Sequence, residues 1–197
     1  MCSSDLEAGR FVADYRLRTT DYGLDVGREI SNFAEVRAGV RSLTGRSRLR
    51  LGDPALKDSQ FSAREYFTRF SYDTLDDRNF PRHGQSLRVE WRGERRALGS
   101  QRDADVATAD WLAARSIGRN TAVLWTSFGT NFAANASDVR SLFPLGGFLN
   151  LSGLPRDSIS GRHYAIGRLV YLRKIGAGGE GFLNVPAYAG VSFEAGN

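Results

Sequence analysis

The residues of this chain that could do covalent chemistry lack the neighbours that such chemistry needs. A serine hydrolase needs a Gly-x-Ser-x-Gly elbow, whose sharp turn exposes the serine. The nearest match, residues 190–194, ends in Glu194 instead of glycine and lies in an alternating, strand-like segment. His83 and His163 are the two histidines of the chain, and a catalytic role for either would need an oriented partner and a nucleophile. We therefore predict no catalytic residue and no enzyme activity for this chain.

Three other patterns could bind a metal ion, a phosphate or a nucleic acid. Asp76, Asp77 and His83 could hold a metal, but Pro81 and Gly84 favour a turn in which Asp77 or Asn79 makes local hydrogen bonds. Glycine-rich residues 176–181 could cradle phosphate, yet no lysine or helix start follows them. The net charge is +5, with acidic residues interleaved among the arginines, which does not favour a nucleic-acid groove. We expect no metal, no cofactor and no nucleic-acid partner.

The elements that must position these residues show an alternation of apolar and polar side chains. In segment 86–94 the apolar face holds Leu87, Val89 and Trp91, while the other face is mostly charged. Strands are predicted at 10–19, 34–43, 46–51, 61–73, 86–94, 105–117, 120–130, 161–174 and 187–195, with a weaker one at 24–30. No apolar run approaches the roughly 20 residues of a membrane-spanning helix. The pattern predicts an all-β chain of about ten strands.

Turn signals separate the predicted strands. Short links are expected at 20–23, 44–45 and 118–120, and longer ones at 52–59, 98–104 and 131–160. Alternating short and long connections are typical of an antiparallel up-and-down barrel in the outer membrane.

Three features favour a transmembrane barrel over a soluble β-sandwich, which also alternates. The segments often reach the length that a tilted strand needs to cross a bilayer. Aromatic residues fall near segment ends, as in interfacial girdles. One face is charged in strand after strand, which suits a water-filled lumen, and we expect His163 on that face. The charged positions assigned to the lumen are Arg37, Arg48, Arg88, Glu90, Arg92 and Glu194.

Segment 142–153, Leu-Phe-Pro-Leu-Gly-Gly-Phe-Leu-Asn-Leu-Ser-Gly, resembles the long loop of the bacterial surface-antigen superfamily of outer-membrane barrels. That group includes barrel assembly factors and two-partner translocators. Its Phe-x-x-Gly-Gly stretch is followed by an Arg-Gly-aromatic tip that folds back into the lumen. Here Gly153 matches the tip, whereas Ser152 replaces the arginine and Leu154 the aromatic residue. The resemblance implies a lumen loop, with a plain surface loop as the alternative; its motif residues are Phe143, Gly146, Gly147, Asn150, Ser152 and Gly153.

The Asn-Leu-Ser-Gly version of the tip is similar to the barrel that follows the lipase domain in patatin-like outer-membrane phospholipases, the self-secreting type. Stretches 48–54, 76–84, 169–173 and 185–197 also fit that subgroup, and the resemblance covers roughly residues 9–197. It implies an incomplete barrel, about ten strands of an expected sixteen or so, that anchors and helps to export a lipid acyl hydrolase. The expected location is the bacterial outer membrane. The implied partners are outer-membrane lipid, an N-terminal lipase domain absent from this chain and the outer-membrane assembly machinery.

The domain organisation follows from the same reading. Residues 1–6 look like a translated adapter instead of native sequence, and residues 7–197 are expected to form one partial barrel domain, truncated at both ends. Two alternatives remain: a protein translocation or outer-membrane assembly pore of the same superfamily, and a soluble β-sandwich binding module. The upstream sequence would separate the first alternative from the lipase anchor.

Overall fold

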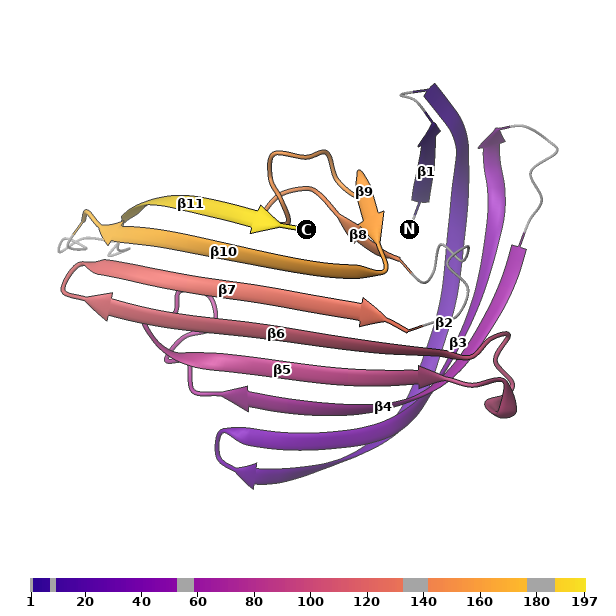
Figure 1. Ribbon diagram of the computed structural model, residues 1–197, viewed down its shortest axis with the longest axis horizontal. Helices are drawn as coiled ribbons and strands as arrows, with labels where there is room; N and C mark the ends of the chain where they lie inside the picture. Colours follow the sequence, from indigo (N-terminus) through magenta and orange to yellow (C-terminus); the bar gives the residue numbers. More distant parts are fainter. Residues whose placement is uncertain (1, 8–9, 53–58, 133–141, 177–186) are drawn as a thin grey trace, which may run out of the picture. The chain divides into compact units, whose positions relative to one another are not determined.

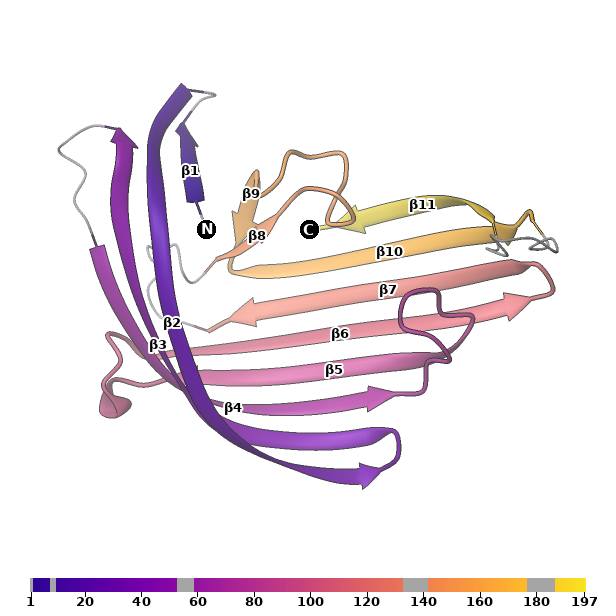
Figure 2. The ribbon, with the colours of Figure 1, turned by 180° about the vertical axis from the view of Figure 1, so that it is seen from behind.

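A computed structural model describes residues 2–7, 10–52, 59–132, 142–176 and 187–197, with no description of the side chains of residues 2–17 and 47–59. The alternating segments form strands, which join in one nine-stranded sheet in the order β1-β2-β3-β4-β5-β6-β7-β10-β11, while β8 and β9 form a separate two-stranded sheet (Figures 1 and 2). The bounds are β1 Cys2–Glu7, β2 Arg10–Ser31, β3 Ala34–Gly52, β4 Ser59–Asp73, β5 His83–Glu94, β6 Ala104–Ile117, β7 Asn120–Asn131, β8 Phe143–Leu145, β9 Ile159–Gly161, β10 His163–Lys174 and β11 Tyr188–Gly196. Among the described residues, no helix is long and apolar enough to cross a membrane.

The chain divides into two compact units. Unit 1 comprises residues 1–26, 38–67 and 92–104, and unit 2 comprises residues 27–37, 68–91 and 105–197. The loop that the resemblance implies, residues 142–153, lies in unit 2, so this unit contains the candidate site.

Two of the predicted turns are wrong. Segments 10–19 and 24–30 are one strand, β2, and segments 34–43 and 46–51 are one strand, β3. Gly45 does not turn the chain: a Cβ on it would lie 2.1 Å from the Phe61 ring, so the glycine leaves room for a neighbouring aromatic side chain. The short link at 118–120 is confirmed, since β6 ends at Ile117 and β7 begins at Asn120.

The register of the strands fixes which side chains share a face of the sheet. In unit 2, Asp110 lies opposite Ser127, and Arg168 lies opposite both Trp125 and Glu194. We call the side that carries these residues the polar face. The other side, the apolar face, carries Phe128, Leu124, Leu169 and Phe193. Successive residues of a strand point to opposite sides, so each strand contributes to both faces.

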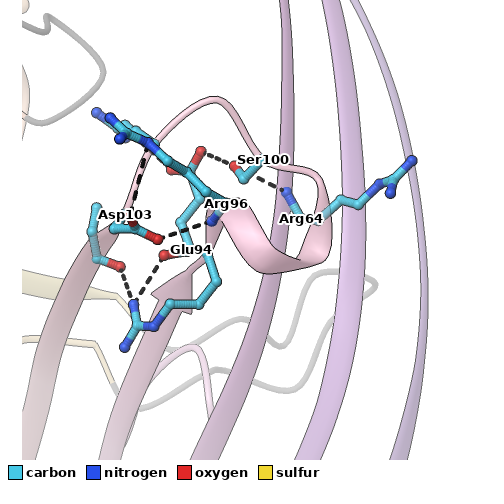
Figure 3. A network of polar contacts seen from close by, with 8 residues as sticks. Arg64, Glu94, Arg96, Ser100 and Asp103 are labelled. Carbon is cyan, nitrogen blue, oxygen red and sulfur yellow. Dashed lines mark hydrogen bonds and ion pairs between the residues drawn. The ribbon is translucent and has the colours of Figure 1, made fainter.

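The connection between β5 and β6 in unit 1 is ordered by charge. Its 3-10 turn spans Arg96–Leu98. The buried Glu94 carboxylate accepts a hydrogen bond from the Ser100 hydroxyl and another, 2.7 Å long, from Arg102 Nε, while Arg96 lies beside Asp103 (Figure 3). A carboxylate that accepts two hydrogen bonds can be buried at an acceptable cost. The predicted link at 98–104 is therefore a compact turn.

The connection between β4 and β5, residues 74–82, is closed by two aspartates. Asp76 Oδ1 accepts N–H bonds from Arg82 at 2.9 Å and from His83 at 3.0 Å. Asp77 Oδ1 accepts N–H bonds from Asn79 at 2.7 Å and from Phe80 at 2.8 Å. The prediction of a locally hydrogen-bonded turn is confirmed. Across the described residues, no group of three His, Cys, Asp or Glu side chains could hold a metal ion.

This turn gives a prediction about pH. The N–H bonds from His83 and Arg82 hold the pKa of Asp76 below its ordinary value. The charged carboxylate therefore stabilises the turn at neutral pH, and this contribution is lost as the pH falls through the lowered pKa. We expect the amides of Arg82 and His83 to be protected from hydrogen exchange at neutral pH and to lose protection in acid.

In Asp76→Asn these amides should be less protected at neutral pH, because a neutral amide oxygen is a weaker acceptor than a carboxylate. Their protection should also depend little on pH, because the amide does not titrate. Asp157→Asn, a change of an exposed carboxylate in another loop, is the control. Hydrogen-exchange mass spectrometry of the 74–83 peptides measures both effects. Equal protection in Asp76→Asn and in the unchanged protein would contradict the assignment.

Candidate functional site

The predicted loop motif forms a compact unit that lies against the polar face. β8 pairs with β9, with Phe143 opposite Gly161 and Leu145 opposite Ile159. Residues 146–158 connect the two strands and lie near the C-terminal end of β11 (Figure 1). The two short strands were not predicted, because three residues are too few to show an alternation.

The base of the loop packs on a tyrosine of β10. The Phe143 and Tyr164 rings have centroids 4.8 Å apart. The Tyr164 hydroxyl lies 2.9 Å from the Ser127 hydroxyl, which in turn donates to Asp110 over 2.6 Å. Three strands, β6, β7 and β10, thus fix the tyrosine that supports Phe143.

Backbone turns shape the middle of the loop. The Gly146 N–H bonds the Asn150 carbonyl at 2.9 Å, and the Gly147 N–H bonds the Leu154 carbonyl at 3.0 Å. Gly146 and Gly147 have φ values of 116° and 104°, a region that glycine enters without a steric penalty. A Cβ on Gly146 would also lie 2.1 Å from the Pro155 carbonyl oxygen. The two predicted glycines are therefore required by the backbone path.

The far end of the loop binds the sheet by polar contacts. Glu194 of β11 accepts the Ser152 N–H at 2.7 Å and the Ser152 hydroxyl at 3.2 Å. Arg168 of β10 donates to the Leu149 carbonyl at 2.9 Å. Of the motif residues, Gly153 is exposed, and a Cβ on it would meet no atom within 4 Å. The structure thus brings Ser152 and Glu194 together and leaves Gly153 at the surface.

Two of the other charged residues predicted for the lumen have ion-pair partners on the sheet. Arg37 pairs with Glu35 at 2.6 Å, and Glu90 pairs with Arg69 at 2.6 Å. Arg92 is half-buried and shares a face of β5 with Glu94. The Arg48 side chain lies outside the described residues.

A polar groove lies in unit 2 at one of the predicted lumen positions, Arg88. Its volume is 720 Å³, and Arg88 lines it together with Glu29, Asp73, Asp110 and Trp125. The groove belongs to the side of the sheet that carries Asp110 and Trp125, the polar face.

The structure also places two residues that the sequence analysis considered for catalysis, His163 and Ser192. His163 was expected on the charged face, but its register partner is Thr130, so it lies on the apolar face, and its Nδ1 is 2.7 Å from Thr130 Oγ1. Ser192 lies within β11 opposite Val170, in an extended strand. Of the glycine-rich stretch, residues 177–181 lie outside the described residues.

The sequence analysis did not identify the residues of β10 that bind the loop, Tyr164 and Arg168. Tyr164 and Arg168 lie on the polar face of the sheet. In the sequence, the row of β10 residues that includes them is otherwise mostly apolar, and Arg168 interrupts it. That interruption was the available signal, because an arginine in an apolar row needs a partner when it is covered.

Glycine at position 129 gives a prediction about the base of the loop. A Cβ there would lie 2.1 Å from Tyr164 Cε1 and 3.0 Å from Phe143 Cζ. Gly129→Ala should therefore displace Tyr164 and destabilise the fold by about 1–3 kcal/mol. Gly167→Ala, on β10, is the matched control, since a Cβ there meets nothing within 4 Å. Thermal unfolding in detergent micelles measures the difference; equal unfolding temperatures for the two variants would contradict the packing described here.

Comparison with known proteins adds one finding to this geometry. No protein-family model matches the chain, and no curated protein matches it. Among solved structures, the chain is similar to that of BamA from Haemophilus ducreyi lacking POTRA domains 1–3, with a TM-score of 0.77 and 12% sequence identity. The match covers 93% of this chain and 42% of the BamA chain, so the chain spans less than half the length of that structure.

At this level of identity the likeness concerns the fold. It confirms the predicted fold class: an all-β, antiparallel, up-and-down sheet that matches part of a BamA-like barrel.

Proposed function

We propose that this chain is part of an outer-membrane β-barrel, with the apolar face in lipid and the polar face toward a water-filled lumen that holds the 143–161 loop. The main support for this proposal is the burial pattern along β7. Ser127 and Asn131 are 3% and 2% exposed, whereas Phe128 on the apolar face is 50% exposed. A protein in water buries its large apolar side chains, so this arrangement suits a hydrocarbon surrounding.

The apolar face continues across the neighbouring strands. Leu169 lies opposite Phe193, and Tyr171 opposite Val191. All four side chains are exposed, Phe193 to 71%. An apolar band on the outside of alternating strands is what lipid-embedded barrels present.

The buried residues argue against the soluble sandwich. Among the described side chains, the buried apolar ones are Ala63, Ala104, Ala114, Leu145 and Ile166. Such a small set of mostly short side chains supplies little of the burial that stabilises two packed sheets in water. The lipid-embedded reading needs no such core, because the bilayer solvates the apolar face.

The larger protein that we propose is a patatin-like phospholipase of the self-secreting type, in which this domain anchors the lipase domain and helps to export it. The support is the order of the resembling stretches between residues 48 and 197, above all the Ser152 form of the loop tip. The second candidate is an assembly or translocation pore, and the likeness to BamA favours it. The complete reading frame separates them: an upstream Gly-x-Ser-x-Gly with an Asp-Gly partner supports the lipase, and repeated POTRA domains support the pore.

Cysteine labelling tests the assignment of the two faces. In a Cys2→Ser background, Val89→Cys and Phe193→Cys place a thiol on the apolar face, while their neighbours Arg88→Cys and Ser192→Cys place one on the polar face. In outer membranes of cells that produce the protein, a charged maleimide should label positions 88 and 192 and should spare 89 and 193 until the protein is unfolded with denaturant.

The matched pairs differ by one residue in sequence, so local disorder would affect both members alike. Equal labelling of 88 and 89, or preferential labelling of 89 and 193, would contradict the proposal. Release of the protein from membranes by a carbonate wash, without heat-modifiable migration on gels, would also contradict it.

A further inference from the structure

Three strands that are neighbours in the sheet, β7, β10 and β11, place a tryptophan, an arginine and a glutamate in one row under the loop. Trp125 of β7 lies opposite Arg168 of β10, and Arg168 lies opposite Glu194 of β11. We infer that Arg168 is the positioning residue that holds the 146–154 loop on the polar face, through its contacts with the Leu149 carbonyl and the Trp125 ring. This inference deepens the proposed function, on which it rests for the role of the loop in the barrel.

The guanidinium of Arg168 is fixed on two sides. Its carbon lies 4.5 Å from the centroid of the Trp125 ring, a stacking contact that a planar cation makes well. Its Nη1 donates to the Leu149 carbonyl at 2.9 Å. Arg168 is half-buried, so water weakens these contacts less than it would at an exposed position.

Glu194 lies beside Arg168 in the same row. The two residues are directly opposite in the β10–β11 pair, so their side chains leave the same face of the sheet. Glu194 accepts the N–H and the hydroxyl of Ser152 at 2.7 and 3.2 Å. The glutamate is thus a second contact between the sheet and the loop, and the loop supplies neutral donors to it.

On the loop side, two of the three contacts are made by main-chain atoms. The Leu149 carbonyl and the Ser152 N–H need a particular backbone path and no particular side chain. Leu149 and Leu151 have φ values of 58° and 68°, which costs a residue with a Cβ of order 1 kcal/mol or more. The Ser152 hydroxyl stabilises this path further, because it accepts the Leu149 N–H at 2.9 Å. The contacts to Arg168 and Glu194 offset the strain.

Loop mobility tests the inference directly. A spin label at Gly153→Cys, in a Cys2→Ser background, occupies open space and reports the mobility of the loop tip. In detergent micelles we expect Arg168→Gln to narrow the spectral lines and to raise the rate of trypsin cleavage after the exposed Arg156 about tenfold, as expected for the loss of one charge-assisted hydrogen bond. Arg173→Gln is the matched control, since Arg173 is an exposed residue on the other face of the same strand.

Arg168→Lys separates the planar guanidinium from its positive charge. It keeps the charge but loses the planar stack on Trp125, so its loop mobility should lie between those of the unchanged protein and of Arg168→Gln. Should Arg168→Gln not fold, Arg168→Lys and Trp125→Leu carry the test, and both should mobilise the loop.

Two results would overturn the inference. Loop mobility in Arg168→Gln equal to that in Arg173→Gln would show that Arg168 does not hold the loop. Loop mobility in Arg168→Lys equal to that in the unchanged protein would show that the planar stack on Trp125 does not position the arginine. Because these measurements are made in micelles, they can fail while the cysteine labelling in membranes succeeds, and the reverse, so the inference and the proposed function fail separately.

Discussion

The antiparallel hydrogen-bond ladder is the constraint on which the rest of the structure depends. Once β7, β10 and β11 pair in register, each side chain has two possible destinations, the polar face or the apolar face. A shift by one residue would exchange Phe128 with Ser127 and Phe193 with Ser192. The register therefore decides at once which residues meet lipid in the proposed barrel and which residues the loop can bind.

The alternation of apolar and polar residues could be read from the sequence because it is a local property, and predicted segments such as 86–94 and 120–130 lie within strands of the structure. The links at 20–23 and 44–45 were wrong because a local glycine signal has two causes. Gly45 lies in a strand and makes room for Phe61, sixteen positions later in the sequence. The residue that explains the glycine comes from the adjacent strand, and no pattern within β3 identifies it.

The site shows the same division between local and non-local information. Gly146 and Gly147 could be named as loop residues from the sequence, and both have φ values in the region that favours glycine. The row of residues under the loop was not predictable from the sequence. Trp125, Arg168 and Glu194 come from three strands, and only the register of these strands shows that they form a row. His163 was misplaced for a related reason: its neighbours Arg162 and Tyr164 are polar, but its own position on β10 belongs to the face of Leu169.

A loop held through its main chain has a consequence for its sequence. When a tip arginine makes the decisive contact, that residue cannot change without loss of the contact. Here Arg168 and Glu194 belong to the sheet, and they bind the Leu149 carbonyl and the Ser152 N–H. The side chains at exposed tip positions such as Gly153 and Leu154 can then vary without loss of the contacts that hold the loop on the sheet. The constraint moves to the strands, where Arg168 must keep its contact with the Trp125 ring and Glu194 must accept the Ser152 N–H. A loop tip without an arginine is therefore compatible with a firmly held loop, because the residues that hold it belong to the row on the sheet.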